Sequence, residues 1–179
     1  MNIGLLKFRP ATENTDLIAE PIKAALMSYA SNQAQNYLVT EIDPEYSDSE
    51  EFCRTYEVAT NLTANCLILE AKRADRVWHA ACLVPFGKRA DINGVIRRQL
   101  GARQVSFAAK DFAVSASQME YGSITIIGLP TDWPLLIDET IIEVPHLVIG
   151  GGLRKSKLLI SGPSLLDLPN AISIEEMSK

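Results

Sequence analysis

The amino-acid sequence predicts a single mixed α/β domain, with a curled sheet or partial barrel that carries peripheral helices. From residue 64 onward, short apolar runs typical of strands alternate with scattered helical segments, and glycine or proline separates many of them. The length of 179 residues, with 47% hydrophobic and 22% charged residues, suits one hydrophobic core. We therefore expect one domain over residues 1–179, with a core from about 36 to 170 and an N-terminal helical segment over 1–35.

The N-terminal part predicts two helices separated by a strand. Apolar residues at helical spacing predict the first helix over 17–29, after a polar cap. Alternating apolar residues predict a strand over 36–42. The second helix is expected to begin at Asp48 or Ser49, because the acidic residues that follow interact favourably with the N-terminal end of a helix.

The centre of the chain predicts a pair of buried strands followed by a helix. Apolar runs over 66–69 and 78–84 are typical of buried strands, and the polar residues 72–76 predict the turn between them. Asp91 is the expected cap of a helix over 92–100.

The remainder predicts one further helix among short strands. This helix covers 110–118, and a final turn of helix over 163–168 precedes a polar tail. The predicted strands cover 104–108, 124–127, 134–137, 146–149 and 157–160.

The composition excludes several classes of protein. The three cysteines are odd in number and widely spaced, so no disulfide framework is expected. His79 and His146 have no ligand-like spacing with cysteine, so we expect no zinc site, no other metal and no cofactor. No apolar run approaches the ~20 residues that cross a bilayer, and the first ten residues become charged too soon for a secretory signal. These features predict a cytoplasmic protein without a membrane partner.

The net charge of −5 conceals a basic stretch between Lys72 and Lys110. Within it, Arg97 and Arg98 lie outside the apolar stripe of the predicted helix. A basic face on an acidic protein could steer a phosphate backbone towards one surface. A solvated helix and loop would carry the same charges, so the sequence leaves both interpretations open.

Two glycine-containing segments are the strongest local candidates for a binding site. Gly122 would let a ligand approach main-chain amides that could hold a carbonyl or phosphate oxygen, although a glycine turn leading into a strand is the simpler alternative. The run Gly150–Gly152 is followed by Arg154, and its amides could also contact an anion. Its contiguous glycines do not match the phosphate-loop motif.

No protein nucleophile is recognisable in the sequence. A serine nucleophile elbow, a His–Asp pair and a Cys–His arrangement are all missing from the sequence pattern. The neighbouring carboxylates Asp138 and Glu139 are more typical of a helix cap than of acid–base catalysis.

A series of short motifs between residues 64 and 154 adds a family resemblance. The motifs are Ala64-Asn65-Cys66-Leu67-Ile68, Ala80-Ala81-Cys82-Leu83-Val84, Asp91-Ile92-Asn93-Gly94-Val95, Leu100-Gly101-Ala102-Arg103, Tyr121-Gly122-Ser123-Ile124-Thr125, Ile127-Gly128-Leu129-Pro130, Leu136-Ile137-Asp138-Glu139 and Gly151-Gly152-Leu153-Arg154. In this order they resemble the YbaK/EbsC-type aminoacyl-tRNA deacylase family, which includes the editing domain of many prolyl-tRNA synthetases.

The resemblance implies a YbaK-like fold and a translation-fidelity hydrolase. Such an enzyme cleaves the ester that links a wrong amino acid, chiefly alanine or cysteine on proline tRNA, to the terminal ribose of the acceptor end. It implies no metal, since water assisted by the tRNA's own hydroxyl attacks the ester while loop amides hold the aminoacyl group. Binding, orientation and oriented dipoles can supply much of the rate for an activated ester.

Two positions depart from the family pattern. Asn65 stands where the family carries a lysine, so it can donate a hydrogen bond but brings no positive charge. Ile126 stands where a proline is expected in the glycine loop, which leaves that loop less constrained. Four lysines are candidates to compensate: Lys72, Lys88, Lys155 and Lys157.

The glycine loops and the resemblance together give the candidate site residues. Candidate catalytic residues are Asn65, Gly122 and Ser123. Candidates for contact with the aminoacyl group are Cys66, Ile124, Thr125, Ile126, Asp138, Gly150, Gly151, Gly152 and Arg154. Candidates for contact with tRNA are Arg97, Arg98, Lys155 and Lys157.

Three functions remain open at this point. The first is a trans-editing deacylase, as the resemblance implies. The second is a catalytically impaired module that binds aminoacyl-tRNA or a small ligand in the same pocket, which the loss of the lysine and the proline favours. The third is a structural subunit whose acidic helix around Glu50 binds a protein partner.

Overall fold

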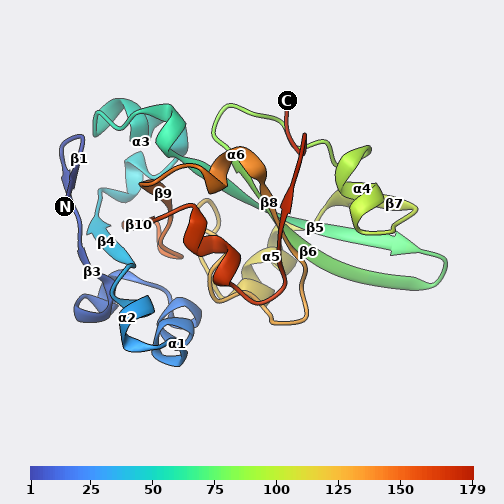
Figure 1. The fold of residues 1–179 in the computed structure, drawn as a ribbon, viewed down its shortest axis with the longest axis horizontal. Helices are drawn as coiled ribbons and strands as arrows, with labels where there is room; N and C mark the ends of the chain where they lie inside the picture. The colour runs from blue at the N-terminus through green and yellow to red at the C-terminus, as the bar shows by residue number, and fades with distance from the viewer.

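A computed structural model describes residues 1–30 and 33–179 in full, and the backbone alone at residues 31 and 32. The mixed α/β class is confirmed, and the strands form open sheets (Figure 1). The N-terminal helices and the smaller sheet lie at one end of the molecule, while a long hairpin of the larger sheet projects from the other end.

The larger sheet has the strand order β11-β8-β6-β5-β7. Its strands are β5 (Ala64–Arg73), β6 (Arg76–Pro85), β7 (Gln104–Phe107), β8 (Leu135–Asp138) and β11 (Ala171–Ile174). The antiparallel hairpin β5–β6 confirms the predicted strand pair and extends it at both ends, down to a tight turn at Ala74 with φ of +52°. Strand β8 pairs parallel with both β6 and β11.

The smaller sheet has the strand order β3-β4-β10-β9 and is antiparallel throughout. Its strands are β3 (Arg9–Pro10), β4 (Leu38–Glu41), β9 (Leu147–Gly150) and β10 (Ser156–Ile160). A separate hairpin joins β1 (Asn2–Ile3) and β2 (Leu6–Lys7). A backbone bridge from Thr63, directly before β5, to Val148 on β9 brings the two larger sheets together.

The helices are short and lie around the sheets. They are α1 (Glu20–Ser28), α2 (Ser31–Ala34), α3 (Ser49–Thr55), α4 (Val95–Gln99), α5 (Lys110–Ser117), α6 (Glu139–Ile142) and the 3₁₀ helix Pro163–Asp167. The Asp91 carboxylate accepts hydrogen bonds from the amides of Gly94 and Val95, so it stabilises the turn that leads into α4. The helix itself begins at Val95 and not at residue 92, and its N-cap is Gly94. The first long helix begins at Glu20 rather than at residue 17, with Pro21 in its first turn, a position that proline favours.

Two secondary-structure predictions are wrong. Residues 124–127 form no strand; Ile126 and Ile127 are buried in an irregular segment instead, because an apolar run reports burial and not backbone pairing. The predicted polar tail contains β11, which pairs parallel with β8 and is followed by the fully buried Met177. Here the partner strand, rather than local hydrophobicity, decides the structure.

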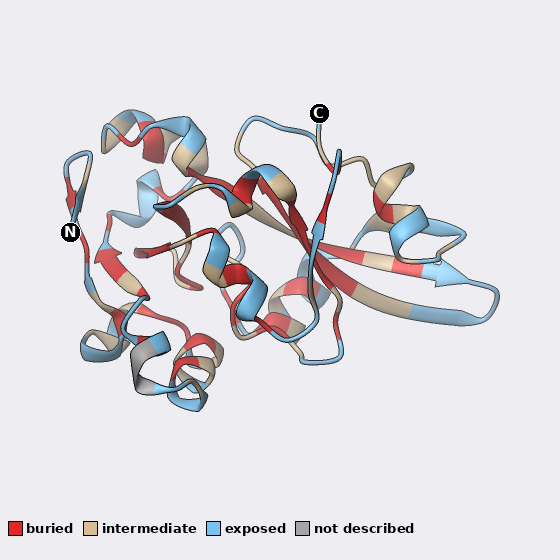
Figure 2. Cartoon of the chain, viewed as in Figure 1, coloured by how far each residue is buried: buried red, intermediate tan, exposed pale blue. Residues whose placement is uncertain are grey.

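The hydrophobic core occupies both faces of the larger sheet (Figure 2). Neighbouring residues of β5 divide between the two faces, as a strand's period of two requires: Ile68 belongs to the cluster shared with α1 and the smaller sheet, and Leu69 to the cluster under α4. The start of β5, where the two sheets meet, therefore packs against other elements on both faces of the sheet. This junction positions the site described next.

Candidate active site

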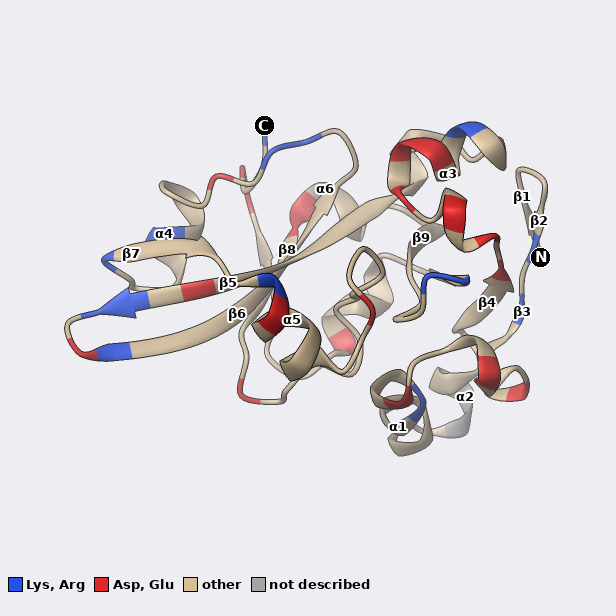
Figure 3. Cartoon of the chain, turned by 180° about the vertical axis from the view of Figure 1, so that it is seen from behind, with Lys and Arg blue, Asp and Glu red and all other residues tan. Residues whose placement is uncertain are grey.

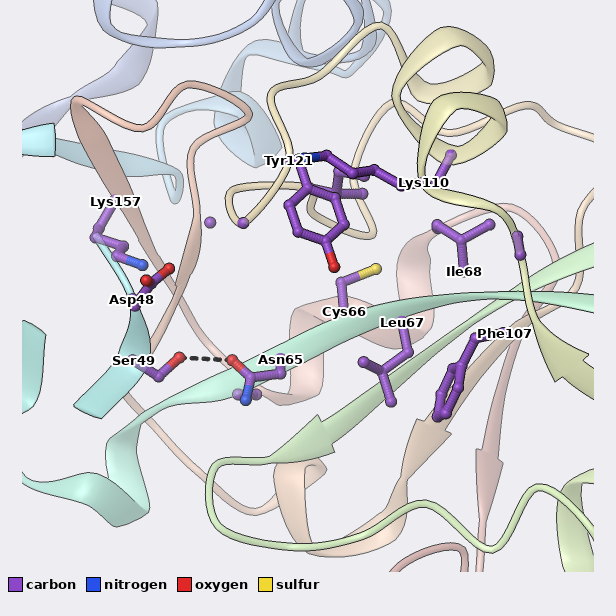
Figure 4. Close-up of a pocket in the computed structure, with 16 residues that line it drawn as sticks. Asp48, Ser49, Asn65, Cys66, Leu67, Ile68, Phe107, Lys110, Tyr121 and Lys157 are labelled. Carbon is purple, nitrogen blue, oxygen red and sulfur yellow. Dashed lines mark hydrogen bonds between the residues drawn. The ribbon is translucent and has the colours of Figure 1, made fainter. Parts of the chain in front are cut away.

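A cavity of ≈ 510 Å³ opens where the start of β5 meets the ends of β9 and β10 (Figure 4). Strand β5 forms one wall, and α3, α5 and the two glycine loops contribute the others. The lining residues are Asp48, Ser49, Ala64, Asn65, Cys66, Leu67, Ile68, Phe107, Ala108, Lys110, Ala113, Tyr121, Gly122, Ile124, Gly150 and Lys157. Asp48, Asn65 and Lys157 lie towards one end of the cavity, and Leu67, Ile68 and Phe107 lie towards the other (Figure 4). Lys110 lies above Ile68 at this second end (Figure 4).

Lys157 is the buried charge at the polar end. It reaches the cavity from β10, with only 6% of the residue exposed, and its Nζ donates a hydrogen bond to the carbonyl oxygen of Ser47 at 2.7 Å. The same nitrogen lies 4.9 Å from the ring centroid of Phe52, within the range of a cation–π interaction. Burial lowers the pKa of the Lys157 ammonium to about 8, because the charged form loses hydration; the nearby Asp48 carboxylate opposes that shift.

Asn65 lies beside this lysine on the wall formed by β5. Its Oδ1 accepts a hydrogen bond from Ser49 Oγ at 2.6 Å, which fixes the orientation of the amide (Figure 4). Among the described residues, the Asn65 amide nitrogen donates no hydrogen bond in return. Its N–H groups are therefore available to an oxygen atom of a ligand.

The apolar end of the cavity contains a cysteine whose thiol has a raised pKa. Cys66, Ile68, Ala113 and Ile124 line it. Burial raises the pKa of the Cys66 thiol far above its usual range, and the neighbouring Cys82 adds to the effect. A protonated thiol is a weak nucleophile, so this environment does not favour attack by Cys66 on a substrate.

The two glycine loops singled out in the sequence meet at one wall of the cavity. Gly122 has φ of +85°, in the left-handed region that glycine adopts without strain. The Gly152 amide donates a hydrogen bond to the carbonyl oxygen of Ser123 at 2.9 Å. A side chain at Gly150 would overlap that same carbonyl group, so glycine is required for the two backbones to approach.

The sequence of this region matches a known family. Residues 43–168, which include the whole of β5 and both glycine loops, match the aminoacyl-tRNA editing domain. The chain belongs to this family.

Solved structures agree with this assignment at the level of the fold. The editing domain resembles hypothetical protein APE2540 with a TM-score of 0.74 and 17% identity, over 87% of this chain and 99% of that one. It also resembles a candidate trans-editing enzyme for prolyl tRNA synthetase with a TM-score of 0.71 and 16% identity, over 95% of this chain and 99% of that one. No curated protein sequence matches the chain.

Several residues predicted from the sequence line the cavity of the editing domain. They are Asn65, Cys66, Gly122, Ile124, Gly150 and Lys157. Lys157 was expected on a tRNA-binding surface, but it is buried inside the cavity, because β10 is the central strand between β4 and β9 and turns this side chain inward.

Other predicted residues are directed away from the cavity. Ser123 and Thr125 are buried, and their hydroxyl groups have no hydrogen-bond partner among the described residues. Ile126 belongs to the main hydrophobic cluster. Thr125 and Ile126 belong to the segment 124–127, for which a strand was predicted, and Ser123 directly precedes it.

Asp138, Gly151 and Gly152 also lie outside the cavity lining. Asp138 is buried at the end of β8, where its carboxylate accepts hydrogen bonds from Thr140 and Ser178 and caps α6. This agrees with the capping alternative rather than with contact to an aminoacyl group. Gly151 and Gly152 are buried behind the wall formed by Gly150.

Arg154 and Lys155 lie at the rim, next to a second hollow. Arg154 donates a hydrogen bond to the carbonyl oxygen of Pro44 at 3.0 Å and lies 3.5 Å from the Asp48 carboxylate. It therefore connects the loop before α3 to the glycine loop that follows β9, and it holds the Asp48 side of the cavity in place.

Arg97 and Arg98 lie far from the cavity, at the end of the molecule where the β5–β6 hairpin turns (Figure 3). Together with Arg73 and Arg103 they line a separate hollow; we call these four residues the arginine cluster. None of the four forms an ion pair with a carboxylate among the described residues. Asn65 and Arg73 are eight residue steps apart on β5, which corresponds to about 26 Å along the strand.

Sequence reasoning missed the residues that reach the cavity from other elements. Asp48 and Ser49 come from the start of α3, and Phe107 follows from β7. Lys110 and Tyr121 flank the entrance, with the lysine Nζ 4.6 Å from the tyrosine ring centroid. Only the predicted start of a helix at Asp48 or Ser49 gave a local signal, and nothing in the spacing places these residues next to β5.

The described residues contain neither a cluster of metal-binding side chains nor a membrane-spanning helix. No three His, Cys, Asp or Glu side chains among them lie together in a way that could hold a metal ion. None of the described helices is long and apolar enough to cross a membrane.

Proposed function

We propose that this editing domain is a trans-editing aminoacyl-tRNA deacylase that cleaves the ester of a mischarged tRNA and releases a small amino acid, such as alanine or cysteine from proline tRNA. The observation that carries the proposal is the ≈ 510 Å³ cavity, whose hydrogen-bonding end adjoins a small apolar end. An aminoacyl ester has the same division between a polar ester and an amino-acid side chain. Family membership supports a tRNA-related substrate.

Water is the nucleophile in this proposal. The Cys66 thiol is protonated, and the Ser123 hydroxyl is buried outside the cavity lining, so neither side chain is suited to attack an ester. The free N–H groups of Asn65 can orient the ester carbonyl or a ribose hydroxyl, and a neighbouring hydroxyl of the tRNA can assist the water. Positioning of this kind supplies rate without a protein nucleophile.

The experiment that tests the function is hydrolysis of a panel of mischarged tRNAs, including alanyl- and cysteinyl-tRNA for proline, by wild type and by Asn65→Ala. We expect release by wild type and roughly tenfold slower release by the variant, because one net hydrogen bond to the substrate is lost. Asn93→Ala, an exposed asparagine far from the cavity, is the matched control and should behave as wild type. Equal release by Asn65→Ala and wild type would exclude a role for this amide.

A second candidate function is a binding module without catalysis. The neutral Asn65 at the cavity wall favours it, since a neutral hydrogen bond polarises an ester less than a charged one. Folded wild-type protein that binds aminoacyl-tRNA but releases no amino acid across the whole panel would support this alternative and exclude the deacylase.

We further propose that the arginine cluster binds phosphate groups of the tRNA while the acceptor end occupies the cavity. The double variant Arg97→Glu/Arg98→Glu should weaken tRNA binding and reduce its dependence on salt, because each lost phosphate contact lowers the number of counterions released. A filter-binding or fluorescence titration over a range of salt concentrations measures this slope. Lys7→Glu/Arg9→Glu, an exposed pair at the opposite end of the molecule, is the charge-matched control, and equal slopes for both double variants would contradict the proposal.

A further inference from the structure

The polar end of the cavity holds a buried ammonium group with no carboxylate within ion-pair distance among the described residues. Lys157 forms no ion pair within the described residues, and its Nζ makes one hydrogen bond there, to the Ser47 carbonyl oxygen. An ammonium group has three hydrogens to donate. Burying a charge is costly unless it is paired and hydrogen-bonded. A ligand oxygen in the cavity would complete the environment of this group.

The carboxylate at the same end is also available to a ligand. Asp48 precedes α3, yet its side chain makes no capping hydrogen bond to the helix. Its side chain is 71% exposed, and its partner is Arg154, 3.5 Å away at the rim. The cavity therefore presents an ammonium and a carboxylate side by side at one end (Figure 4), with Cys66 and Ile68 at the other.

An α-aminoacyl group matches this arrangement in charge and polarity. Its carbonyl oxygen accepts hydrogen bonds, its α-ammonium group is positive at neutral pH, and both are attached within two bonds of the carbon that carries the side chain. A phosphate alone would suit the lysine but not the aspartate, and a purely apolar ligand would suit neither. The polar end thus favours a ligand that carries an acceptor and a cation close together.

We propose that Lys157 and Asp48 recognise the aminoacyl group itself: the lysine holds its carbonyl oxygen, the aspartate holds its α-ammonium group, and the side chain points to the apolar end. This inference rests on the proposed function, because it assumes that an aminoacyl ester enters the cavity. It assigns the two charged residues that read the amino-acid backbone, whereas Cys66 and its neighbours limit the side chain.

Two non-hydrolysable probes separate these roles. One is 3′-alanylamino-3′-deoxyadenosine, and the other is the matching 3′-propanoylamino compound, which keeps the carbonyl and loses the α-amino group. In calorimetric titrations at pH 7, both probes should bind to Lys157→Met at least roughly tenfold more weakly than to wild type, since a charge-assisted hydrogen bond is lost. Asp48→Asn should weaken the alanyl probe by a similar factor and the propanoyl probe much less, because the propanoyl probe has no α-amino group and senses Asp48 only through the pKa of Lys157. Lys88→Met and Asp75→Asn, exposed residues outside the cavity, are the matched controls.

The pH dependence of probe affinity distinguishes a lysine that binds the ligand from one that only stabilises the fold. The groups facing Lys157 are Asp48, Cys53 and Arg154, and burial is the main influence on its pKa of about 8. Below this pH the ammonium is charged, and above it the charge is lost. Affinity for the propanoyl probe, which does not titrate in this range, should therefore fall as the pH rises through about 8 in wild type and stay flat in Lys157→Met.

The outcomes distinguish this inference from the proposed function. The inference would be overturned if Lys157→Met bound both probes as tightly as wild type does. It would also be overturned if Asp48→Asn weakened the binding of both probes equally. Either result would count even if amino acids are released. A pH-independent affinity of wild type would also overturn it, and this measurement does not require any variant to fold. Probe binding as expected, without amino-acid release across the tRNA panel, would uphold the inference and refute the deacylase.

Discussion

Replacing Cys66 with phenylalanine is expected to lower amino-acid release by about 100-fold or more. The Cys66 side chain enters the cavity from β5 below Tyr121 (Figure 4), so a benzyl group there would occupy the space proposed for the amino-acid side chain. A 100-fold loss corresponds to about 2.7 kcal/mol of transition-state stabilisation. Single-turnover release from alanyl-tRNA, measured beside the thermal unfolding of each variant, tests the expectation.

Cys66→Ala is the matched control for this prediction. It removes the thiol and enlarges the apolar end, and since the thiol is protonated in the folded protein, release of alanine should continue at a rate close to wild type. Cys66→Ala should release larger amino acids faster than wild type does, because each additional methylene group that fits the cavity contributes about 1–3 kcal/mol to transition-state binding. Loss of all release in Cys66→Ala would show that the thiol takes part in the chemistry, contrary to the mechanism proposed above.

Local patterns predicted the elements whose residues pair or cap within a short stretch of chain. The strands 66–69 and 78–84, the helix after Asp91 and the helix over 110–118 follow from hydrophobic spacing and capping residues, and the structure confirms them. The segment 124–127 and the strand β11 do not follow, because their conformation depends on partners distant in the sequence. Burial at 124–127 was correct, and the strand assigned to it was wrong.

The candidate site divides in the same way. The two glycine loops and Asn65 could be selected from sequence, since glycine requirements and motif positions are local features. Asp48 and Ser49 could not, because they enter the cavity only when α3 packs beside the start of β5. Lys157 was one of four lysines that spacing could not separate, and only the position of β10 between β4 and β9 selects it.

The position of Lys157 bears on the missing family lysine. The resemblance implies a lysine on β5, where this chain carries Asn65, and a lysine from β10 lines the same cavity. An amine delivered from a different strand approaches the ligand from another direction, so the two arrangements are not geometrically equivalent. Lys157 nevertheless supplies a desolvated ammonium, whose electrostatic effect is stronger in a buried site than in water.

The second large effect is expected at the contact between the glycine loops. In Gly150→Ala the new Cβ would overlap the Ser123 carbonyl oxygen and lie 2.9 Å from the carbonyl carbon, and both neighbours are backbone atoms that cannot move aside cheaply. We expect a loss of about 3 kcal/mol in the free energy of unfolding, at the upper end for an overpacked site. At about 2–4 °C per kcal/mol for a protein of this size, the melting temperature should fall by roughly 6–12 °C.

Gly101→Ala separates this steric cost from the conformational cost of losing a glycine. Gly101 has φ of +62°, and no atom lies within 4 Å of the position that an alanine methyl group would take, so its replacement costs only the left-handed backbone, about 1 kcal/mol. Gly150 has no positive φ, so its cost comes from the overlap alone. Equal melting temperatures for the two variants would show that moving the loops apart costs no more than placing an alanine in the left-handed conformation at Gly101. A larger loss in Gly150→Ala, together with slower amino-acid release, would show that this backbone contact both stabilises the fold and shapes the wall of the cavity.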